Sequence, residues 1–89
     1  MDSRYIAEAI GTMVFLTIIL KSGGDKYVII AGLLAAILLM GDISGGHFNP
    51  AVSFMQYVSG NMTMQDFGGY AVAQLLGAFL ATKLVAMLK

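Results

Sequence analysis

Residues 44–52, Ser44-Gly45-Gly46-His47-Phe48-Asn49-Pro50-Ala51-Val52, interrupt an apolar sequence at a point where no helix can continue. Two glycines and a proline fall within six residues, and both residue types disfavour a helix interior. Residues 51–58 then form a short apolar run with helical character. Asn49 suits the N-cap of that run, and Pro50 suits the first helical position, where its missing N–H costs nothing. The stretch therefore predicts an extended, glycine-rich segment that leads into a helix of about two turns, which Gly60 ends.

Long uncharged segments flank this stretch on both sides. We expect membrane-spanning helices at about residues 4–21, 27–43 and 65–88, each near the lower end of the length that crosses a bilayer. Residues 44–58 lie between the second and third helices. We expect the whole chain, 1–89, to form a single structural repeat. All ten charged residues lie at or near segment ends except one carboxylate inside the first helix; they are Asp2, Arg4, Glu8, Lys21, Asp25, Lys26, Asp42, Asp66, Lys83 and Lys89.

Composition excludes several classes of protein. In the 89 residues, 58% are hydrophobic and only 11% are charged, whereas an average soluble domain is about 25% charged. The absence of cysteine excludes a disulfide scaffold and a thiolate metal site, and the net charge of zero offers no basic surface for nucleic acid. We find no nucleophile–base pair, no cluster of metal ligands around the single histidine and no cofactor motif. We therefore expect an integral, multi-pass membrane protein in contact with lipid, and no enzyme.

An irregular segment at membrane depth is tolerated only where protein buries it or where it lines a wet cavity. The stretch 44–58 therefore predicts a re-entrant loop with a half-helix. The fold class that follows is an all-α membrane protein with three transmembrane helices and one re-entrant half-helix.

Three motifs, in order, resemble the first half of a major intrinsic protein, the aquaporin and aquaglyceroporin family. Residues 44–52 resemble the lead-in and the first Asn-Pro-Ala box of the family. Residues 7–12 (Ala-Glu-Ala-Ile-Gly-Thr) resemble the opening of its first helix, and residues 74–78 (Gln-Leu-Leu-Gly-Ala) resemble its third-helix signature. The resemblance implies one half of an inverted repeat whose two half-helices meet at the bilayer midplane. No second Asn-Pro-Ala box follows residue 60.

The resemblance assigns the pore to the Asn-Pro-Ala box. Asn49 caps the half-helix and is expected to aim its amide N–H groups at a passing oxygen, with a cap alone as the alternative. Pro50 and Ala51 are expected to stack against the same residues of a second half. The helix N-terminus adds positive potential, which repels cations and protons.

The residues before the box are expected to line the pore through their backbone. Extended backbone at Gly45, Gly46, His47 and Phe48 would present a ladder of carbonyl oxygens to water, whereas the alternative is a bare turn. His47 as a metal ligand is disfavoured, because no second ligand cluster exists.

Two polar residues within the apolar helices are expected to brace the loop. Intramembrane carboxylates are costly and mark function or a buried network. By resemblance, Glu8 accepts backbone N–H groups of the loop, with proton relay as the alternative. Gln74 is expected to brace the loop or a helix, with a merely buried polar residue as the alternative.

The chain departs from the family pattern at the selectivity constriction. Val52 follows the box, as in a first half, and the arginine that follows the family's second box has no counterpart. Counting back from Asn49 places the second-helix filter position near Ile29, where water-selective members carry an aromatic residue. The aliphatic residue at this position, together with the missing arginine, suggests a wider and less polar constriction than that of a strict water channel. Asp42 stands where many relatives have histidine, and either places negative charge at a mouth or ends the helix.

Half a channel cannot enclose a pore, so a second half must supply the other wall. We expect a passive channel for water or small neutral solutes such as glycerol, formed by an antiparallel homodimer with one box from each chain. By analogy, four such dimers would form an octamer. The alternatives are an accessory or structural subunit that needs a complementary half, and a dual-topology transporter that uses Glu8. Three or four lysines lie on one side of the membrane and Arg4 lies on the other. This imbalance either is too weak to fix the orientation of the chain or favours insertion in one orientation.

Overall fold

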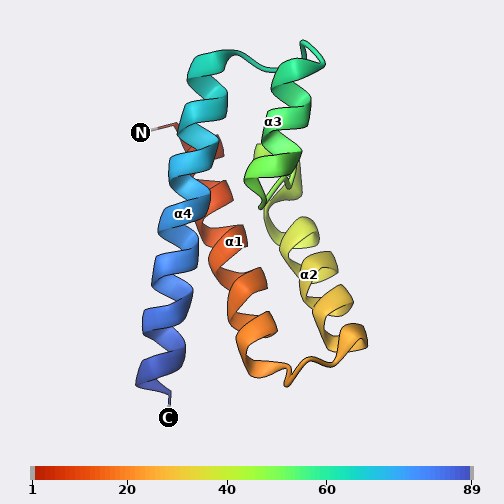
Figure 1. Ribbon diagram of the computed structural model, residues 1–89, viewed down its shortest axis with the longest axis vertical. Coiled ribbons are helices and arrows are strands. Elements are labelled where there is room, and N and C mark those ends of the chain that lie inside the picture. Colours follow the sequence, from red (N-terminus) through yellow and green to blue (C-terminus); the bar gives the residue numbers. More distant parts are fainter. Residues whose placement is uncertain (1, 89) are drawn as a thin grey trace.

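The computed structural model describes residues 2–88, which form four α-helices and, in that range, no strand. The helices are α1 (Ser3–Lys21), α2 (Lys26–Ser44), α3 (Pro50–Val58) and α4 (Met64–Met87). Helices α1, α2 and α4 are long and apolar enough to cross a membrane, whereas α3 has only 9 residues. The expected fold class, three spanning helices plus a half-helix, is therefore confirmed for one chain (Figure 1).

Short polar side chains start the three long helices. The side chain of Asp2 accepts the backbone N–H of Arg4 at 2.9 Å, and Asp25 accepts that of Tyr27 at 2.9 Å. Thr63 accepts the N–H of Asp66 at 3.0 Å. Each cap satisfies one of the amide groups that a helix N-terminus leaves without an intrahelical partner.

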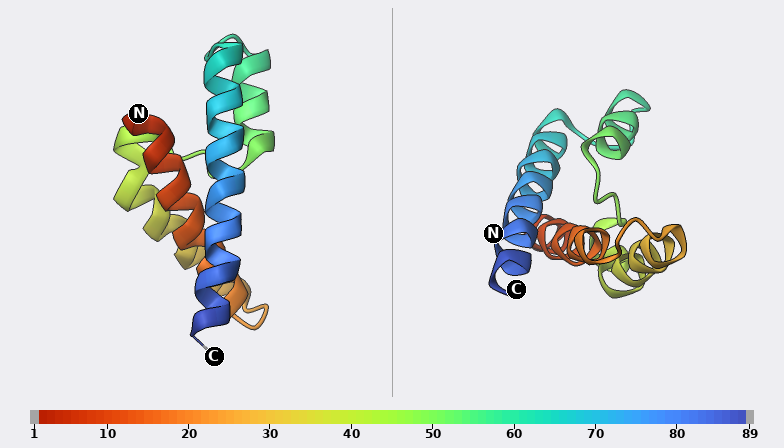
Figure 2. Two further views of the ribbon diagram at one scale, coloured as in Figure 1. Left: turned by 90° about the vertical axis from the view of Figure 1, so that its left-hand side faces the viewer. Right: turned by 60° about the horizontal axis from the view of Figure 1, so that its bottom comes forward.

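The central helix of the bundle is α1, which packs against both α2 and α4, while α3 packs against α4 (Figures 1 and 2). Small residues let the long helices approach closely. A Cβ atom added at Gly77 would lie 2.5 Å from the carbonyl oxygen of Ala9, and one at Gly32 would lie 2.6 Å from a methyl carbon of Ile18. These two glycines therefore set the α1–α4 and α1–α2 distances.

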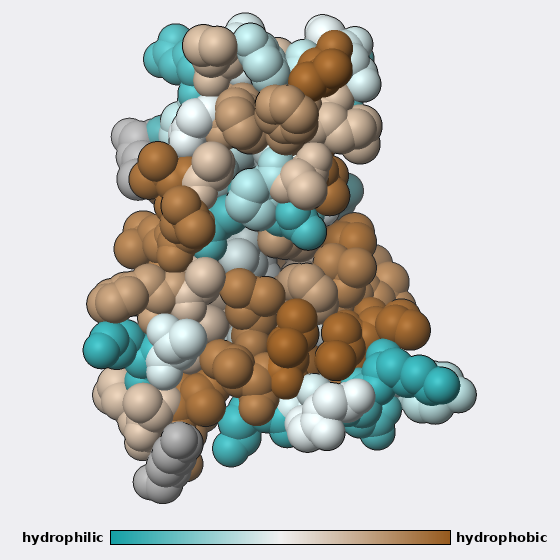
Figure 3. Space-filling model, in the orientation of Figure 1, coloured by the Kyte–Doolittle hydropathy of each residue, from teal (hydrophilic) through white to brown (hydrophobic). Residues whose placement is uncertain are grey.

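The interior is polar and the exterior is apolar, which is the reverse of a soluble domain. The largest fully buried side chains are Gln74, Glu8, Thr12 and Ser53. Large apolar side chains on α2 and α4 are exposed, including Leu38 at 73% and Val72 at 68%. Figure 3 shows a brown apolar band between polar ends, as expected for a surface that faces lipid. We therefore describe the chain as an integral, multi-pass membrane protein.

Candidate functional site

The connection between α2 and α3 turns the chain into the interior of the bundle. Gly45 and Gly46 have positive φ angles of 90° and 69°, which favour glycine, and Phe48 has φ 53° although it has a side chain. A non-glycine residue in this left-handed region costs roughly 1–2 kcal/mol. The Phe48 ring is only 3% exposed and lies directly against Gly11. Burial of this ring therefore offsets the backbone strain and fixes the chain just before Asn49.

The carboxylate of Glu8 lies at the centre of the loop's hydrogen bonds. Its Oε2 atom accepts from the hydroxyl of Ser44 at 2.7 Å and from the backbone N–H of His47 at 3.0 Å. Its Oε1 atom accepts from the backbone N–H of Phe48 at 2.8 Å and from the side-chain amide of Gln74 at 2.9 Å. Glu8 is fully buried. One side chain of α1 thus connects the end of α2, the loop and α4.

A second group of polar contacts joins the half-helix to this network. The Gln74 amide also donates to the hydroxyl of Ser53 at 2.9 Å, and Nδ1 of His47 lies 2.8 Å from the same hydroxyl. The Ser53 hydroxyl therefore contacts both α4, through Gln74, and the loop, through His47. Tyr70 donates its hydroxyl to the carbonyl of Ser44 at 2.6 Å, and its ring lies 4.8 Å from that of His47.

Sequence reasoning missed Ser53 and Tyr70 as members of this network. A signal existed for each. Ser53 is a polar residue four positions after Asn49 in a mostly apolar run, and Tyr70 lies one helical turn before Gln74 on the same face of α4.

Asn49 is extended, with φ −159°, and its side-chain oxygen accepts the N–H of Ala51 at 2.8 Å. The side-chain amide nitrogen of Asn49 makes no hydrogen bond within the described residues, and the residue is exposed. Pro50 and Ala51 are also exposed. Figure 1 shows α3 beginning at about mid-height of α4 and rising toward the end of the bundle where α4 starts. The unpartnered amide is therefore presented near the middle of the bundle.

A groove of about 340 Å³ opens beside Asn49, on the side of the box away from α3. Its walls come from the middle of α1 and of α4, and Asn49 and Pro50 form its rim. The lining residues from the two helices are Thr12, Phe15, Leu16, Ile19, Gln74, Leu75 and Ala78.

The structure does not bring the two expected constriction residues together within one chain. Ile29 lies in the first turn of α2 and Val52 lies in α3, and these two helices make no direct contact. Neither residue lines the groove beside Asn49.

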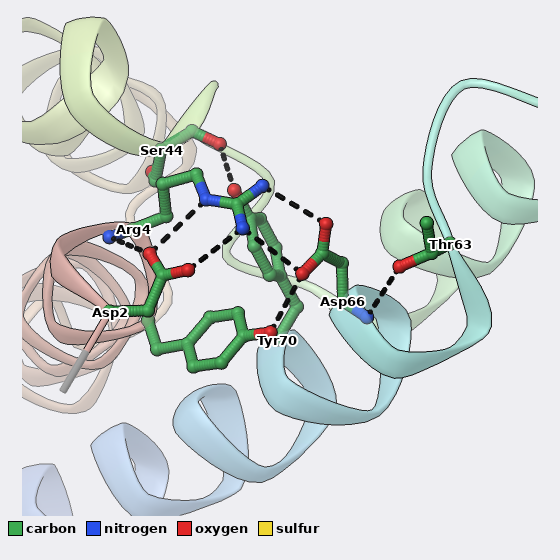
Figure 4. A network of polar contacts seen from close by, with 7 residues as sticks. Asp2, Arg4, Ser44, Thr63, Asp66 and Tyr70 are labelled. Carbon is green, nitrogen blue, oxygen red and sulfur yellow. Dashed lines mark hydrogen bonds and ion pairs between the residues drawn. The ribbon is translucent and has the colours of Figure 1, made fainter.

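A charged cluster lies at the end of the bundle that carries the N-terminus (Figure 4). Arg4 donates to both carboxylate oxygens of Asp66, at 3.1 and 3.0 Å, and to Asp2 at 2.8 Å. The hydroxyl of Tyr5 donates to Asp66 at 2.7 Å. Hydrogen bonds from Arg4 lower the pKa of the Asp2 carboxyl below its ordinary value. This cluster ties the start of α1 to the start of α4, and His47, Gln56 and Asn61 line a polar pocket beside it (260 Å³).

Comparison with known proteins identifies the family. The family model described as "Major intrinsic protein" matches residues 2–89. The chain belongs to this family. This match confirms the resemblance seen in the three sequence motifs. The major intrinsic proteins are membrane channels, not enzymes.

Curated relatives match between about half and nearly the whole of the chain and are much longer than it. It is 32% identical to aquaglyceroporin AqpS of Rhizobium meliloti, over 96% of the chain and 43% of the relative. It is 37% identical to glycerol uptake facilitator protein-like 6 of Lactiplantibacillus plantarum, over 92% of the chain and 42% of the relative. Aquaporin TIP1-1 of Arabidopsis thaliana is 46% identical over 56% of the chain and 20% of the relative. The chain thus spans less than half the length of these relatives, and no solved structure matches it.

Proposed function

We propose that this chain is one half of a passive channel for water and small neutral solutes such as glycerol. The observation that carries the proposal is the unpartnered amide of Asn49, held at the N-terminus of a half-helix beside an open groove. An amide N–H beside a helix N-terminus offers a hydrogen bond to a solute oxygen and a positive potential that disfavours cations. Names of the relatives that refer to water and glycerol transport support the same solute class.

The other wall of the pore, in this proposal, is a second copy of the chain in the opposite orientation. A twofold axis in the membrane plane would place Pro50 and Ala51 of each copy against those of the other, with one Asn49 from each copy in the pore. The carbonyl groups of residues 45–48 would form the ladder that accepts hydrogen bonds from water. Four such dimers, by analogy, would make an octamer.

Glu8 and Gln74 act in this proposal as braces for the loop. Four donors point at the Glu8 carboxylate, and the Gln74 amide donates one N–H group to Glu8 and the other to Ser53. Protonation of Glu8 would remove acceptor capacity that three other elements use. This argues against the transporter alternative, in which Glu8 gains and loses a proton in each cycle.

The constriction is proposed to be wide and weakly polar. Ile29 and Val52 are aliphatic, and no arginine of this chain lies near the box. Because α2 and α3 make no contact within one chain, any constriction formed by both residues would need Ile29 of one copy and Val52 of the other. Such a constriction would admit glycerol as well as water.

Osmotic measurements on purified protein in liposomes test the proposal. We expect the protein-containing vesicles to be more permeable to water and glycerol than empty vesicles. Equal permeability of the two kinds of vesicle would refute the channel. Ala51→Trp should block the pore, because Ala51 is exposed beside Asn49. Leu80→Trp is the matched control, since Leu80 is 40% exposed on α4 and lies outside the groove beside Asn49.

A second candidate is a subunit that needs a complementary half from another protein. The observation in its favour is the lysine excess at one end: Lys21, Lys26 and Lys83 lie toward the end opposite Arg4. A strong positive-inside bias would insert every copy in one orientation. Permeability that arises only on co-expression with a second half would support this candidate.

A further inference from the structure

A wedge-shaped groove opens between the first turns of α1 and the first turns of α4. Its volume is about 490 Å³, larger than that of the groove beside Asn49, and its lining residues are apolar apart from Tyr5. The left view of Figure 2 shows the two helices diverging toward the end that carries the N-terminus. They approach most closely at Gly77, where an added Cβ atom would lie 2.5 Å from the carbonyl oxygen of Ala9. The wedge is therefore closed toward the middle of the bundle.

The wedge lies on the side of α4 that faces away from the candidate pore. Residues two apart on a helix are separated by about 200° around its axis. Val72 and Leu76 line the wedge and are 68% and 45% exposed, whereas Gln74 between them is buried in the loop network. Side chains of this kind offer almost no hydrogen bond to a hydroxylated solute. The wedge is therefore a lipid-facing surface and not a second solute path.

The dimensions of the wedge match a lipid chain and not a helix. Eight residues separate Gly68 from Leu76, about 12 Å at 1.5 Å per residue. The hydrocarbon core is about 30 Å thick, so one leaflet contributes about 15 Å, and the wedge spans most of one leaflet. A spanning helix of a neighbouring protein would need a seam along the whole core, but α1 and α4 close the wedge near Gly77.

Gly68 leaves room in the wedge that the described chain does not use. A Cβ atom added there would meet nothing within 4 Å, whereas one at Gly69 would overlap the ring of Tyr5. Glycine inside a helix is less stable than alanine, so packing within the chain explains Gly69 but not Gly68. The room beside Gly68 is open to a molecule that enters from the bilayer.

The mouth of the wedge lies beside the charged cluster of Figure 4, because Tyr5 lines the wedge and donates its hydroxyl to Asp66. Arg4 donates four of its five N–H groups to Asp2 and Asp66, which leaves one without a partner among the described residues. The side chains of Arg4 and Asp2 are 41% and 33% exposed. Two carboxylates against one guanidinium make the cluster net negative. It therefore offers one donor to a phosphate oxygen and an attraction for an ammonium group.

We infer that the wedge binds one acyl chain of a phospholipid whose headgroup carries a primary ammonium group, such as phosphatidylethanolamine. The acyl chain fills the room beside Gly68 as far as Leu76. The phosphate accepts the remaining N–H of Arg4, and the ammonium group lies beside Asp2. An anionic headgroup such as phosphatidylglycerol lacks the ammonium group and is disfavoured by the net negative cluster. The site does not depend on the proposed channel, since it lies on the other side of α4.

Fluorescence quenching by brominated lipids tests the site, because the chain has no tryptophan of its own. Val72→Trp places a reporter on the wall of the wedge. Leu38→Trp is the matched control on α2, because Leu38 is 73% exposed and does not line the wedge. Each variant is reconstituted in phosphatidylcholine vesicles that contain the same mole fraction of either phosphatidylethanolamine or phosphatidylglycerol, brominated on the acyl chains.

We expect the Val72→Trp reporter to show an apparent affinity about two- to fivefold higher for phosphatidylethanolamine than for phosphatidylglycerol, as for an exposed ion pair. The Leu38→Trp control should show no preference. Equal affinities at the Val72→Trp reporter would overturn the site. A Val72→Trp reporter that neither lipid quenches, beside a Leu38→Trp control that both quench, would show that protein covers the wedge, and would also overturn it.

A pair of charge substitutions tests the role of the cluster. Asp2→Asn and Asp42→Asn each remove one carboxylate from the same end of the bundle, and asparagine at position 2 keeps the cap of α1. We expect Asp2→Asn alone to abolish the lipid preference at the Val72→Trp reporter, and high salt to weaken it in the parent. Equal loss in both variants, or no loss in either, would show that the cluster does not select the headgroup.

Discussion

The carboxylate of Glu8 lies 2.8 Å from the backbone nitrogen of Phe48, so that a side chain of the first helix holds the residue directly before Asn49. The strained backbone of Phe48, with φ 53°, places Asn49 at the start of α3. Glu8 and the buried Phe48 ring together determine where the Asn49 amide points. The polar interior of this bundle therefore serves to position the half-helix.

Replacing Glu8 by Gln should loosen the loop. A neutral amide has one acceptor oxygen in place of two, and its NH₂ group would face donors from the loop or Gln74. We expect a loss of roughly 2–4 kcal/mol in unfolding free energy, the cost of one or two charge-assisted hydrogen bonds. Denaturant titration in detergent micelles measures it.

The control for Glu8→Gln is Asp42→Asn, because Asp42 is exposed and should change stability little. Equal stability of Glu8→Gln and the parent chain would contradict the bracing role. Solute flux that follows a proton gradient in the parent and disappears in Glu8→Gln would instead favour the transporter.

Gly11→Ala should displace the Phe48 ring. The added Cβ would overlap the ring, which is buried and has little room to move. We expect a loss of roughly 1–3 kcal/mol in stability, as for an overpacked core, together with reduced water permeability. The matched control is Gly68→Ala on α4, where a Cβ would meet nothing within 4 Å. Equal permeability of the two variants would show that the ring position does not control the pore.

Two substitutions of Asn49 separate capping from solute contact. Asn49→Asp keeps the oxygen that caps α3 and places negative charge at a helix N-terminus, so stability should hold within about 1 kcal/mol. It removes the N–H donors, so glycerol permeability should fall by roughly fivefold for a lost hydrogen bond of about 1 kcal/mol. A cation leak should also appear.

Asn49→Ala loses both functions, and should cost about 1 kcal/mol in stability as well as permeability. Melting temperature and liposome flux are measured on the same preparations. If Asn49→Asp conducts like the parent, then the residue is only a cap.

The sequence was sufficient to predict the fold class, because its deciding features are local. A glycine pair, an Asn-Pro start and uncharged segments of membrane length each specify their own structure without reference to distant residues. The bracing role of Glu8 is predictable for a similar reason, since a carboxylate inside an apolar helix requires partners.

The rest depended on contacts between distant segments. Ser53 and Tyr70 join the network only because the loop folds back between α1 and α4; their helical spacing from Asn49 and Gln74 marks a shared face but does not predict the contacts with His47 and Ser44. Counting back from Asn49 placed a filter position near Ile29, but a count along the chain does not say which segments lie opposite that residue, and α2 makes no contact with α3, which carries Val52.

Whether one chain supplies both halves of the channel can be measured by mapping the orientation of the chain in a single membrane population. Ser22→Cys lies in the turn between α1 and α2, and Asn61→Cys lies in the loop between α3 and α4, at the opposite end. Each variant is treated with a membrane-impermeant maleimide in intact cells and again after lysis. If both orientations are present, we expect a fraction of the chains to be labelled in intact cells for both variants, and all chains after lysis. Complete labelling of one variant in intact cells, with no labelling of the other, would contradict this expectation.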